Sequence, residues 1–134
     1  MKVLLDTNVI VSAVTTRGLC ADAFRAILAE HELVICPQVL QEVRRILRIK
    51  FGVPEQLIAE YLELIGQEAI MAGSEDLPDL PIQDQDDAEI VAAAISARAE
   101  VLVTGDHELQ SLKTIGQLKI IYPRAFWKEL TATE

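Results

Sequence analysis

The stretch VLLDTNVIVSAV, residues 3–14, is apolar on both sides of one polar interruption, Asp6-Thr7-Asn8. The residues before the interruption are typical of a buried β-strand, and those after it are typical of a helix. A carboxylate is seldom buried unless it is paired or binds a metal. Asp6 is therefore expected at the end of the first strand, with a partner that comes from elsewhere in the chain.

The composition indicates a folded globular protein. Of the 134 residues, 51% are hydrophobic and 25% are charged, which is the balance of a globular domain. Only 4% are aromatic, so the core is expected to consist mainly of Val, Ile, Leu and Ala, which suits a parallel sheet covered by helices. At this length we expect a single domain over residues 1–134.

Charge and cysteine content limit the classes of function. The formal net charge of −9 argues against a general electrostatic attraction to nucleic acid, although acidic residues concentrate in 75–108 and basic ones in 44–50. Cys20 and Cys36 form neither a disulfide framework nor a CxxC metal motif, so we expect free thiols in a reducing compartment. No segment approaches the ~20 apolar residues of a membrane span, and we expect a cytoplasmic protein without membrane association.

Short apolar runs alternate with helical patterns along the chain. Runs rich in β-branched and aliphatic residues predict strands at 2–6, 32–36, 68–72, 100–104 and 118–122. Periodicity predicts helices at 9–14, 19–30, 38–50, 55–66, 86–98 and 124–131. Gly66 is expected to end one of them. This alternation predicts an α/β fold with a mostly parallel sheet of about five strands, which would bind ligands beyond the carboxyl ends of its strands.

Asp87 lies in the apolar stripe of the helix predicted over 86–98. On a helical wheel of about 100° per residue it falls next to Val91, so it is expected to project toward the sheet. Asp86 and Glu89 point away from this stripe, and we expect them to form a capping box in which Asp86 caps the helix. Capping does not explain an inward-facing Asp87, which favours a role in a site.

The helix predicted over 38–50 carries Glu42 at the flank of its core face. For Glu42, a partly solvated carboxylate and a site residue are both open interpretations. Arg44, Arg45 and Arg48 lie on the opposite face of this helix. A solvated surface is the simpler interpretation for these arginines, and contact with nucleic-acid phosphates is the alternative.

Polar residues next to two predicted strand ends have simple local explanations. Asp106 is explained by a turn or by the capping of a short helix, and His107 after it is expected on an exposed turn. Thr7 or Asn8 is likewise expected to cap the helix that follows the first strand. These explanations are adequate singly, but they leave the joint position of the acids unexplained.

Four acidic residues are expected at one edge of the sheet, from the ends of two strands and the early turns of two helices. They are Asp6, Glu42, Asp87 and Asp106. Two charges ~5 Å apart repel by about 3 kcal/mol at an effective dielectric constant of about 20, so such a cluster needs protons or cations to neutralise it. Ligand sets made only of oxygens select Mg²⁺ or Mn²⁺ over zinc, and such ions act chiefly on phosphates.

At these residues the sequence resembles the PIN-domain family, a nuclease fold found in VapC-type toxins and RNA-processing proteins. LLDTNVIVSA (4–13) resembles the family's opening motif, and CPQVLQEVRRIL (36–47) resembles the second. DQDDAEIVAAAISARAEVLVTGDHEL (84–109) resembles the third and fourth. The residue roles that follow are catalytic and metal-binding acids at Asp6, Glu42, Asp87 and Asp106, supporting residues at Thr7, Asn8 and Thr104, and further acids at Asp84, Asp86 and Glu108.

The resemblance implies a three-layer α/β/α sandwich that hydrolyses single-stranded or structured RNA with Mg²⁺ or Mn²⁺. It also implies the toxin of a toxin–antitoxin pair, with a small antitoxin as partner and a homodimer as the assembly. Two other functions stay open. An aspartyl-nucleophile phosphatase also begins with a strand and an aspartate, but its motif needs a second aspartate where Asn8 stands. A non-catalytic binding module would use the same acids to hold a structural ion or a partner.

Overall fold

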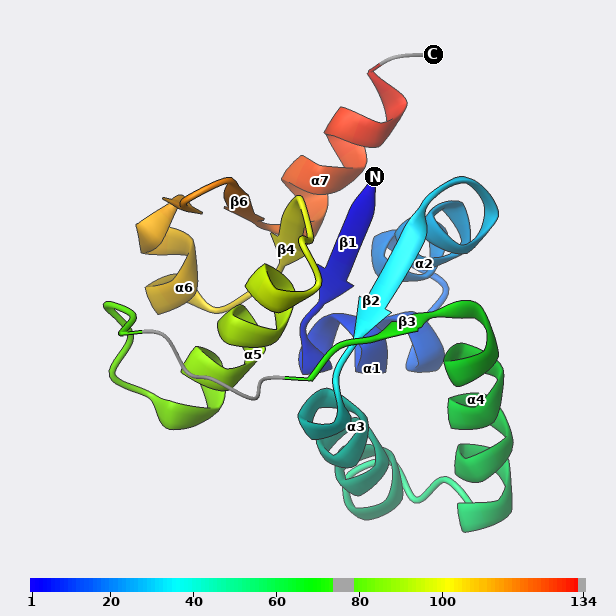
Figure 1. The fold of residues 1–134 in the computed structure, drawn as a ribbon. Coiled ribbons are helices and arrows are strands. Elements are labelled where there is room, and N and C mark those ends of the chain that lie inside the picture. The colour runs from blue at the N-terminus through cyan, green and yellow to red at the C-terminus, as the bar shows by residue number, and fades with distance from the viewer. Residues whose placement is uncertain (74–78, 133–134) are drawn as a thin grey trace.

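A six-stranded sheet forms the centre of the protein (Figure 1). The computed structural model describes residues 1–73 and 79–132; part of the acidic stretch, residues 75–78, lies outside them. The strands are β1 Lys2–Leu5, β2 Glu32–Ile35, β3 Ile70–Met71, β4 Val101–Val103, β5 Thr114–Ile115 and β6 Leu118–Ile121. Their spatial order is β3-β2-β1-β4-β6-β5, and every neighbouring pair is parallel except β5 and β6.

The structure confirms the predicted α/β class and the mostly parallel sheet, but it adds one strand. Strand β5 has only two residues and pairs with β6 as an antiparallel hairpin, with Thr114 opposite Lys119. Gly116 in the turn has a φ of 59°, a conformation that glycine adopts readily. Two residues are too few to show an alternating pattern, so the sequence did not reveal this strand.

Helices cover both faces of the sheet. They are α1 Thr7–Thr15, α2 Leu19–Glu30, α3 Pro37–Ile49, α4 Glu55–Glu68, α5 Gln85–Ser96, α6 His107–Leu112 and α7 Pro123–Thr131. After β3 the chain reverses its direction across the sheet, and right-handed crossovers therefore place α5 on the face opposite α2. Figure 1 shows α5 in front of the sheet and α2 behind it, and α7 packs against α2. This arrangement has the three layers expected of a PIN-like fold.

Several helix boundaries differ from the prediction because other residues cap the helices. Asp6, not Thr7 or Asn8, caps α1, and its side chain accepts a hydrogen bond from the Thr7 backbone N–H. Asp84 caps α5 in the same way, so the capping box expected from Asp86 and Glu89 is wrong. Gly66 does not end α4 either, because the helix continues to Glu68. Helix α6, which begins directly after Asp106, had no predicted range.

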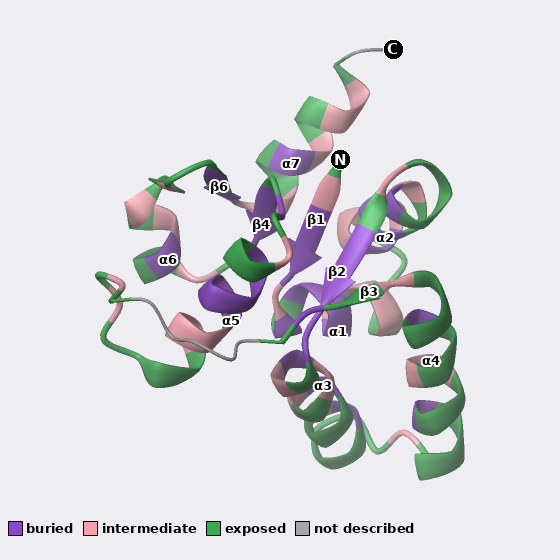
Figure 2. Cartoon of the chain, viewed as in Figure 1, coloured by how far each residue is buried: buried purple, intermediate pink, exposed green. Residues whose placement is uncertain are grey.

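The core is aliphatic and centres on β1, whose residues Val3, Leu4 and Leu5 are almost completely buried. In Figure 2 the central strands are buried along most of their length, whereas α3 and α4 present exposed outer faces. Burial of β1 on both sides is what a parallel strand covered by two helical layers requires. In the described ranges, no helix is long and apolar enough to cross a membrane.

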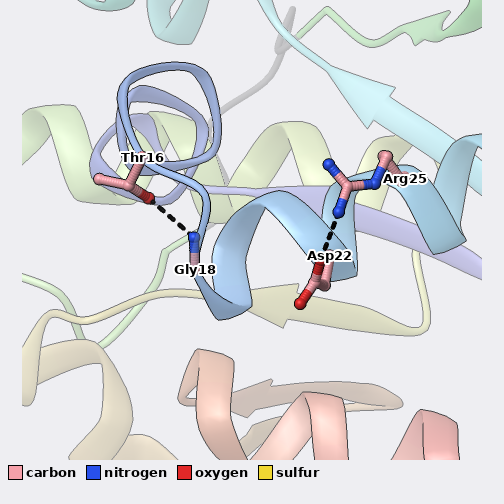
Figure 3. Close-up of polar contacts among 4 residues, drawn as sticks. All are labelled: Thr16, Gly18, Asp22 and Arg25. Atoms are coloured by element: carbon pink, nitrogen blue, oxygen red, sulfur yellow. Dashed lines mark hydrogen bonds and ion pairs between the residues drawn. The ribbon is translucent and has the colours of Figure 1, made fainter.

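A small set of polar contacts orders the connection between α1 and α2 (Figure 3). The Gly18 backbone N–H donates to the Thr16 hydroxyl over 3.4 Å, directly before α2 begins. Within α2, Arg25 and Asp22 form an ion pair one turn apart on the exposed side. The ion pair lies on the exposed side of α2 and not at a strand end, which makes this helix a suitable place for control substitutions.

Phe126 is the largest completely buried side chain, and it anchors α7 to the core. We expect Phe126→Ala to lower the free energy of unfolding by about 3–5 kcal/mol, because the change removes buried surface and leaves a cavity. Urea denaturation measures this loss. Arg124→Ala on the exposed face of the same helix should change stability by less than about 0.5 kcal/mol. Equal effects of the two substitutions would contradict the packing role of Phe126.

Candidate active site

The carboxyl ends of the central strands open into a cleft of about 720 Å³ that contains the four predicted acids. The cleft is bounded by the start of α1, by α3, and by the first turns of α5 and α6. Its lining residues are Asp6, Thr7, Asn8, Glu42, Arg45, Ile46, Asp86, Asp87, Ile90, Gly105, Asp106 and His107. Residues distant in sequence therefore meet at one edge of the sheet, as expected for a parallel α/β fold.

Asp6 follows β1 and is held at both carboxylate oxygens. Its backbone N–H donates to the Val103 carbonyl over 3.0 Å, which continues the pairing of β1 with β4 by one residue. Oδ1 accepts from the Thr7 N–H over 2.7 Å, and Oδ2 accepts from the Thr104 hydroxyl over 2.7 Å. These bonds determine the direction in which the Asp6 carboxylate points.

Thr104 connects two of the acids. Its side chain is completely buried at the end of β4, and its hydroxyl oxygen also accepts from the Asp106 backbone N–H over 3.0 Å. A single hydroxyl group thus donates to Asp6 and accepts from the backbone of Asp106. A valine at position 104 would keep the volume but would lose both bonds.

Glu42 on α3 is held in a similar way by a threonine. The Thr7 hydroxyl donates to Oε2 of Glu42 over 3.0 Å, and Thr7 itself is 3% exposed. Thr7 therefore donates to Asp6 through its backbone N–H and to Glu42 through its hydroxyl. Thr7 lines the cleft, where the family resemblance had implied a supporting residue, and it is not the cap of α1 that the local pattern had suggested.

Asp106 caps α6 and is directed by the backbone of that helix. Its Oδ1 accepts from the N–H groups of Glu108 and Leu109 over 2.8 and 3.1 Å. Such N–H groups satisfy a carboxylate charge at a helix start. The short helix α6 therefore determines where Asp106 lies in the cleft.

Asp87 experiences the strongest electrostatic perturbation in the cleft. Burial, the largest cause, and the neighbouring charges of Asp106, Asp84, Asp6 and Glu108 together raise the pKa of the Asp87 carboxyl from its usual 3.8 to about 6. Repulsion between carboxylates favours the neutral form of one of them. The groups around Asp87 thus do not fully compensate the negative charge of the acids near it.

The other predicted residues take different positions around the cleft. Asp86 lines the cleft, although the helical wheel had turned it away. Asn8 lines it from α1, and Asp84 caps α5 beside it. Glu108 lines a smaller adjoining cavity that shares Asp87 with the main cleft.

The three arginines of α3 separate into two groups. Arg45 is exposed and lines the cleft together with Glu42, so its predicted position on the face opposite Glu42 is wrong. Arg44 instead forms an ion pair with Glu55 over 2.7 Å, and Arg48 is not among the residues that line the cleft. Only Arg45 is therefore positioned for the phosphate contact considered from the sequence.

Sequence reasoning missed His107 as a residue of the cleft. It is the first residue of α6 and is exposed, as expected, but it also lines the cleft beside Asp106. The available signal was the capping aspartate before it, because a first-turn residue must lie close to its cap. Ile46 of α3 and Ile90 of α5 add apolar groups to the lining of the cleft.

The donor set of the cleft fits a hard divalent cation in its chemistry. It consists mainly of carboxylate oxygens, which Mg²⁺ and Mn²⁺ prefer, and the charges of neighbouring acids contribute, after burial, to the raised pKa of Asp87. Among the described side chains, however, no three His, Cys, Asp or Glu groups converge closely enough to form a complete ligand set.

Comparison with known proteins identifies the family. The sequence model of the PIN domain matches residues 2–108, which include all four acids. The chain belongs to the PIN-domain family. Members of this family are generally nucleases, so membership indicates a hydrolase at this coarse level. A comparison with curated proteins gives no significant match.

Three solved structures have a similar fold. VapBC-1 from nontypeable Haemophilus influenzae matches with a TM-score of 0.62 and 21% identity, over 92% of this chain and 99% of the other. FitAB bound to the IR36 DNA fragment matches with a TM-score of 0.62 and 16% identity, over 93% of this chain and 95% of the other. VapBC2 from Rickettsia felis, bound to a DNA fragment from its promoter, matches with a TM-score of 0.60 and 17% identity, over 90% of this chain and 97% of the other. The similarity concerns the fold.

The raised pKa of Asp87 predicts a pH-dependent effect on stability. Since the folded protein holds this proton more tightly than the unfolded chain, ionisation of Asp87 destabilises the fold as pH rises from about 4 through 6. In EDTA, Asp87→Asn should therefore raise the melting temperature at pH 8. The expected rise is about 4 °C for each kcal/mol of destabilisation that the ionised Asp87 carboxylate causes, and little change is expected at pH 4.

The control for this prediction is Asp86→Asn, which alters a more exposed carboxylate on the same turn of α5. Thermal denaturation of both variants at the two pH values makes the comparison. If Asp87→Asn raised the melting temperature equally at pH 4 and pH 8, the effect would not come from the charge of Asp87.

Proposed function

We propose that the protein is a metal-dependent endoribonuclease that hydrolyses phosphodiester bonds in single-stranded RNA. The observation that carries this proposal is the meeting of Asp6, Glu42, Asp87 and Asp106 in one cleft. Buried threonine hydroxyls orient two of these carboxylates. Membership of the PIN-domain family supports the same class of reaction.

The four acids are the residues that would hold Mg²⁺ or Mn²⁺. Such an ion, when bound, supplies positive charge for a non-bridging phosphate oxygen and lowers the pKa of the attacking water. It would also offset the negative charge of the cleft, which otherwise opposes the approach of a polyanion.

The protein's own residues position these acids and the substrate. Thr104 and Thr7 hold the carboxylates of Asp6 and Glu42 in fixed orientations. Arg45 supplies a guanidinium for a phosphate on the side of the cleft formed by α3. Asn8 adds a neutral polar group close to Asp6. Preorientation of this kind reduces the reorganisation that binding and reaction require.

We further propose that the protein is the toxin of a toxin–antitoxin pair. The VapBC and FitAB structures of similar fold each contain two different proteins, which supports a small antitoxin as partner. An apolar groove of about 580 Å³ between α2 and α4 offers a surface for such a partner, with Leu28 and Leu64 exposed along it. A homodimer, a cytoplasmic location and a single domain over 1–134 remain predictions from the sequence.

The two other functions have weaker support. A phosphatase that uses Asp6 as nucleophile lacks its second aspartate, because Asn8 stands in that position. A non-catalytic module would explain the acids but not why buried hydroxyls orient them. Covalent trapping of Asp6 with a phosphate analogue would support the first, and metal binding without cleavage of any RNA or DNA would support the second.

Asp6→Asn should abolish RNA cleavage while the fold remains intact. Asparagine keeps the size of the side chain but removes a negative charge that a cation and the reaction need, so we expect a rate loss of at least about 100-fold. Cleavage of an end-labelled single-stranded RNA is measured with Mn²⁺, with Mg²⁺ and with EDTA, and only EDTA should stop the wild-type protein.

The matched control is Asp22→Asn on α2, which removes an exposed carboxylate that pairs with Arg25 (Figure 3). It should cleave at the wild-type rate. Cleavage by Asp6→Asn at the wild-type rate, or wild-type cleavage that EDTA leaves unchanged, would overturn the proposed mechanism. Thermal denaturation verifies that both variants are folded.

Leu64→Glu should prevent binding of the antitoxin and leave RNA cleavage unchanged. The substitution places a charge in the apolar groove, which disfavours burial by a partner. The assay is copurification with the product of a short reading frame next to the gene, after coexpression. Leu57→Glu, also exposed on α4 but outside the groove, should retain the partner. Loss of the partner in both variants, or in neither, would contradict a role for the groove.

A further inference from the structure

One ring side chain of the cleft, His107, and its neighbour Tyr122 have no role in the function proposed above. The Tyr122 hydroxyl and Nδ1 of His107 are 2.6 Å apart and share a hydrogen bond. The two rings also make an edge contact, with centroids 5.8 Å apart and an angle of 73° between their planes. Both the hydrogen bond and the ring contact restrict rotation of the imidazole.

The pair forms where two neighbouring strands end. His107 begins α6, which follows β4, and Tyr122 follows β6 and caps α7. Strands β4 and β6 are parallel neighbours, so their carboxyl ends bring together residues that lie 15 positions apart (Figure 1). Of the two, His107 lines the cleft, and Tyr122 is not among its lining residues. Tyr122 therefore supports His107 from outside the cleft.

The hydrogen bond determines which ring nitrogen can bind another group. Nδ1 is occupied by Tyr122, so Nε2 is the nitrogen that remains. When the tyrosine hydroxyl donates to Nδ1, the ring proton lies on Nε2, which makes Nε2–H a donor. A donor with a restricted orientation suits an acceptor such as a phosphate oxygen.

The position of His107 relative to Arg45 suggests what that acceptor is. Arg45 lies on α3, which follows β2, and His107 lies on α6, which follows β4. Strands β2 and β4 flank β1, so the two nitrogen-bearing side chains come from opposite sides of Asp6. The rest of the polar lining is mainly carboxylate, and a polyanionic strand needs donors on both sides of such a centre.

We propose that Nε2–H of His107 binds a non-bridging phosphate oxygen of the substrate strand, on the α6 side of the cleft. In this proposal Tyr122 is a positioning residue that acts only through His107. The proposal rests on the nuclease function proposed above and adds a specific substrate contact to it.

Three substitutions distinguish this contact from a structural role. His107→Asn removes the donor at the Nε2 position, whereas His107→Gln places an amide N–H close to that position. Tyr122→Phe keeps the ring contact but removes the hydroxyl. With a short single-stranded RNA and Mn²⁺, His107→Asn should raise KM about 10-fold with kcat changed less than about 2-fold, because a hydrogen bond to a charged acceptor is lost. His107→Gln should recover most of this loss.

Tyr122→Phe should raise KM about 3-fold in the wild-type background and should have no further effect in His107→Asn, because Tyr122 acts through His107. An unchanged KM in His107→Asn would overturn the proposal while leaving the nuclease function intact. The same holds if Tyr122→Phe raised KM by the same factor in the wild-type protein and in His107→Asn. Wild-type protein that neither binds nor cleaves RNA would overturn both. Melting temperatures of all variants verify folding, and RNA binding measured on an Asp6→Asn background tests the contact without cleavage.

Discussion

The hydrogen bond from the Thr104 hydroxyl to the Asp6 carboxylate is the interaction on which the geometry of the cleft depends. It joins the ends of β1 and β4, and the same oxygen accepts the N–H of Asp106. Because the Thr104 side chain is completely buried, losing its hydroxyl would remove from Asp6 and from the Asp106 N–H the partner that orients them. The pairing of β1 with β4 therefore determines how Asp6 and Asp106 are oriented.

Helix capping reduces the cost of placing several acids in and beside one cleft. Asp6, Asp84 and Asp106 cap α1, α5 and α6, so backbone N–H groups and the positive ends of three helices compensate part of their charge. Asp87 is not a cap; it contributes its backbone N–H to Asp84, and burial and the neighbouring acids raise the pKa of its carboxyl. The remaining excess of negative charge is therefore concentrated around Asp87, which is where a cation would have the largest effect.

The order of strands and helices could be predicted from the sequence because alternating apolar runs and helical periods are local signals. The inward position of Asp87 was visible for the same reason. The cap of α5 was not, because Asp84 and Asp86 have equal preference for a helix start and the backbone conformation decides between them. The distinction of Arg45 from Arg44 depends on the rotation of α3 against α5 and α6, and the pairing of His107 with Tyr122 depends on the neighbouring ends of β4 and β6. These are tertiary contacts, which periodicity does not encode.

Asp6 and Thr104, which meet in the cleft, are separated by 98 positions in the chain. During synthesis the first acid leaves the ribosome long before the residue that orients it, and β1 cannot pair with β4 until Val101–Val103 has been made. A partly synthesised chain therefore has the carboxylates but not their arrangement. The long separation delays the assembly of the cleft until the segment that contains Thr104 has been translated and has paired with β1.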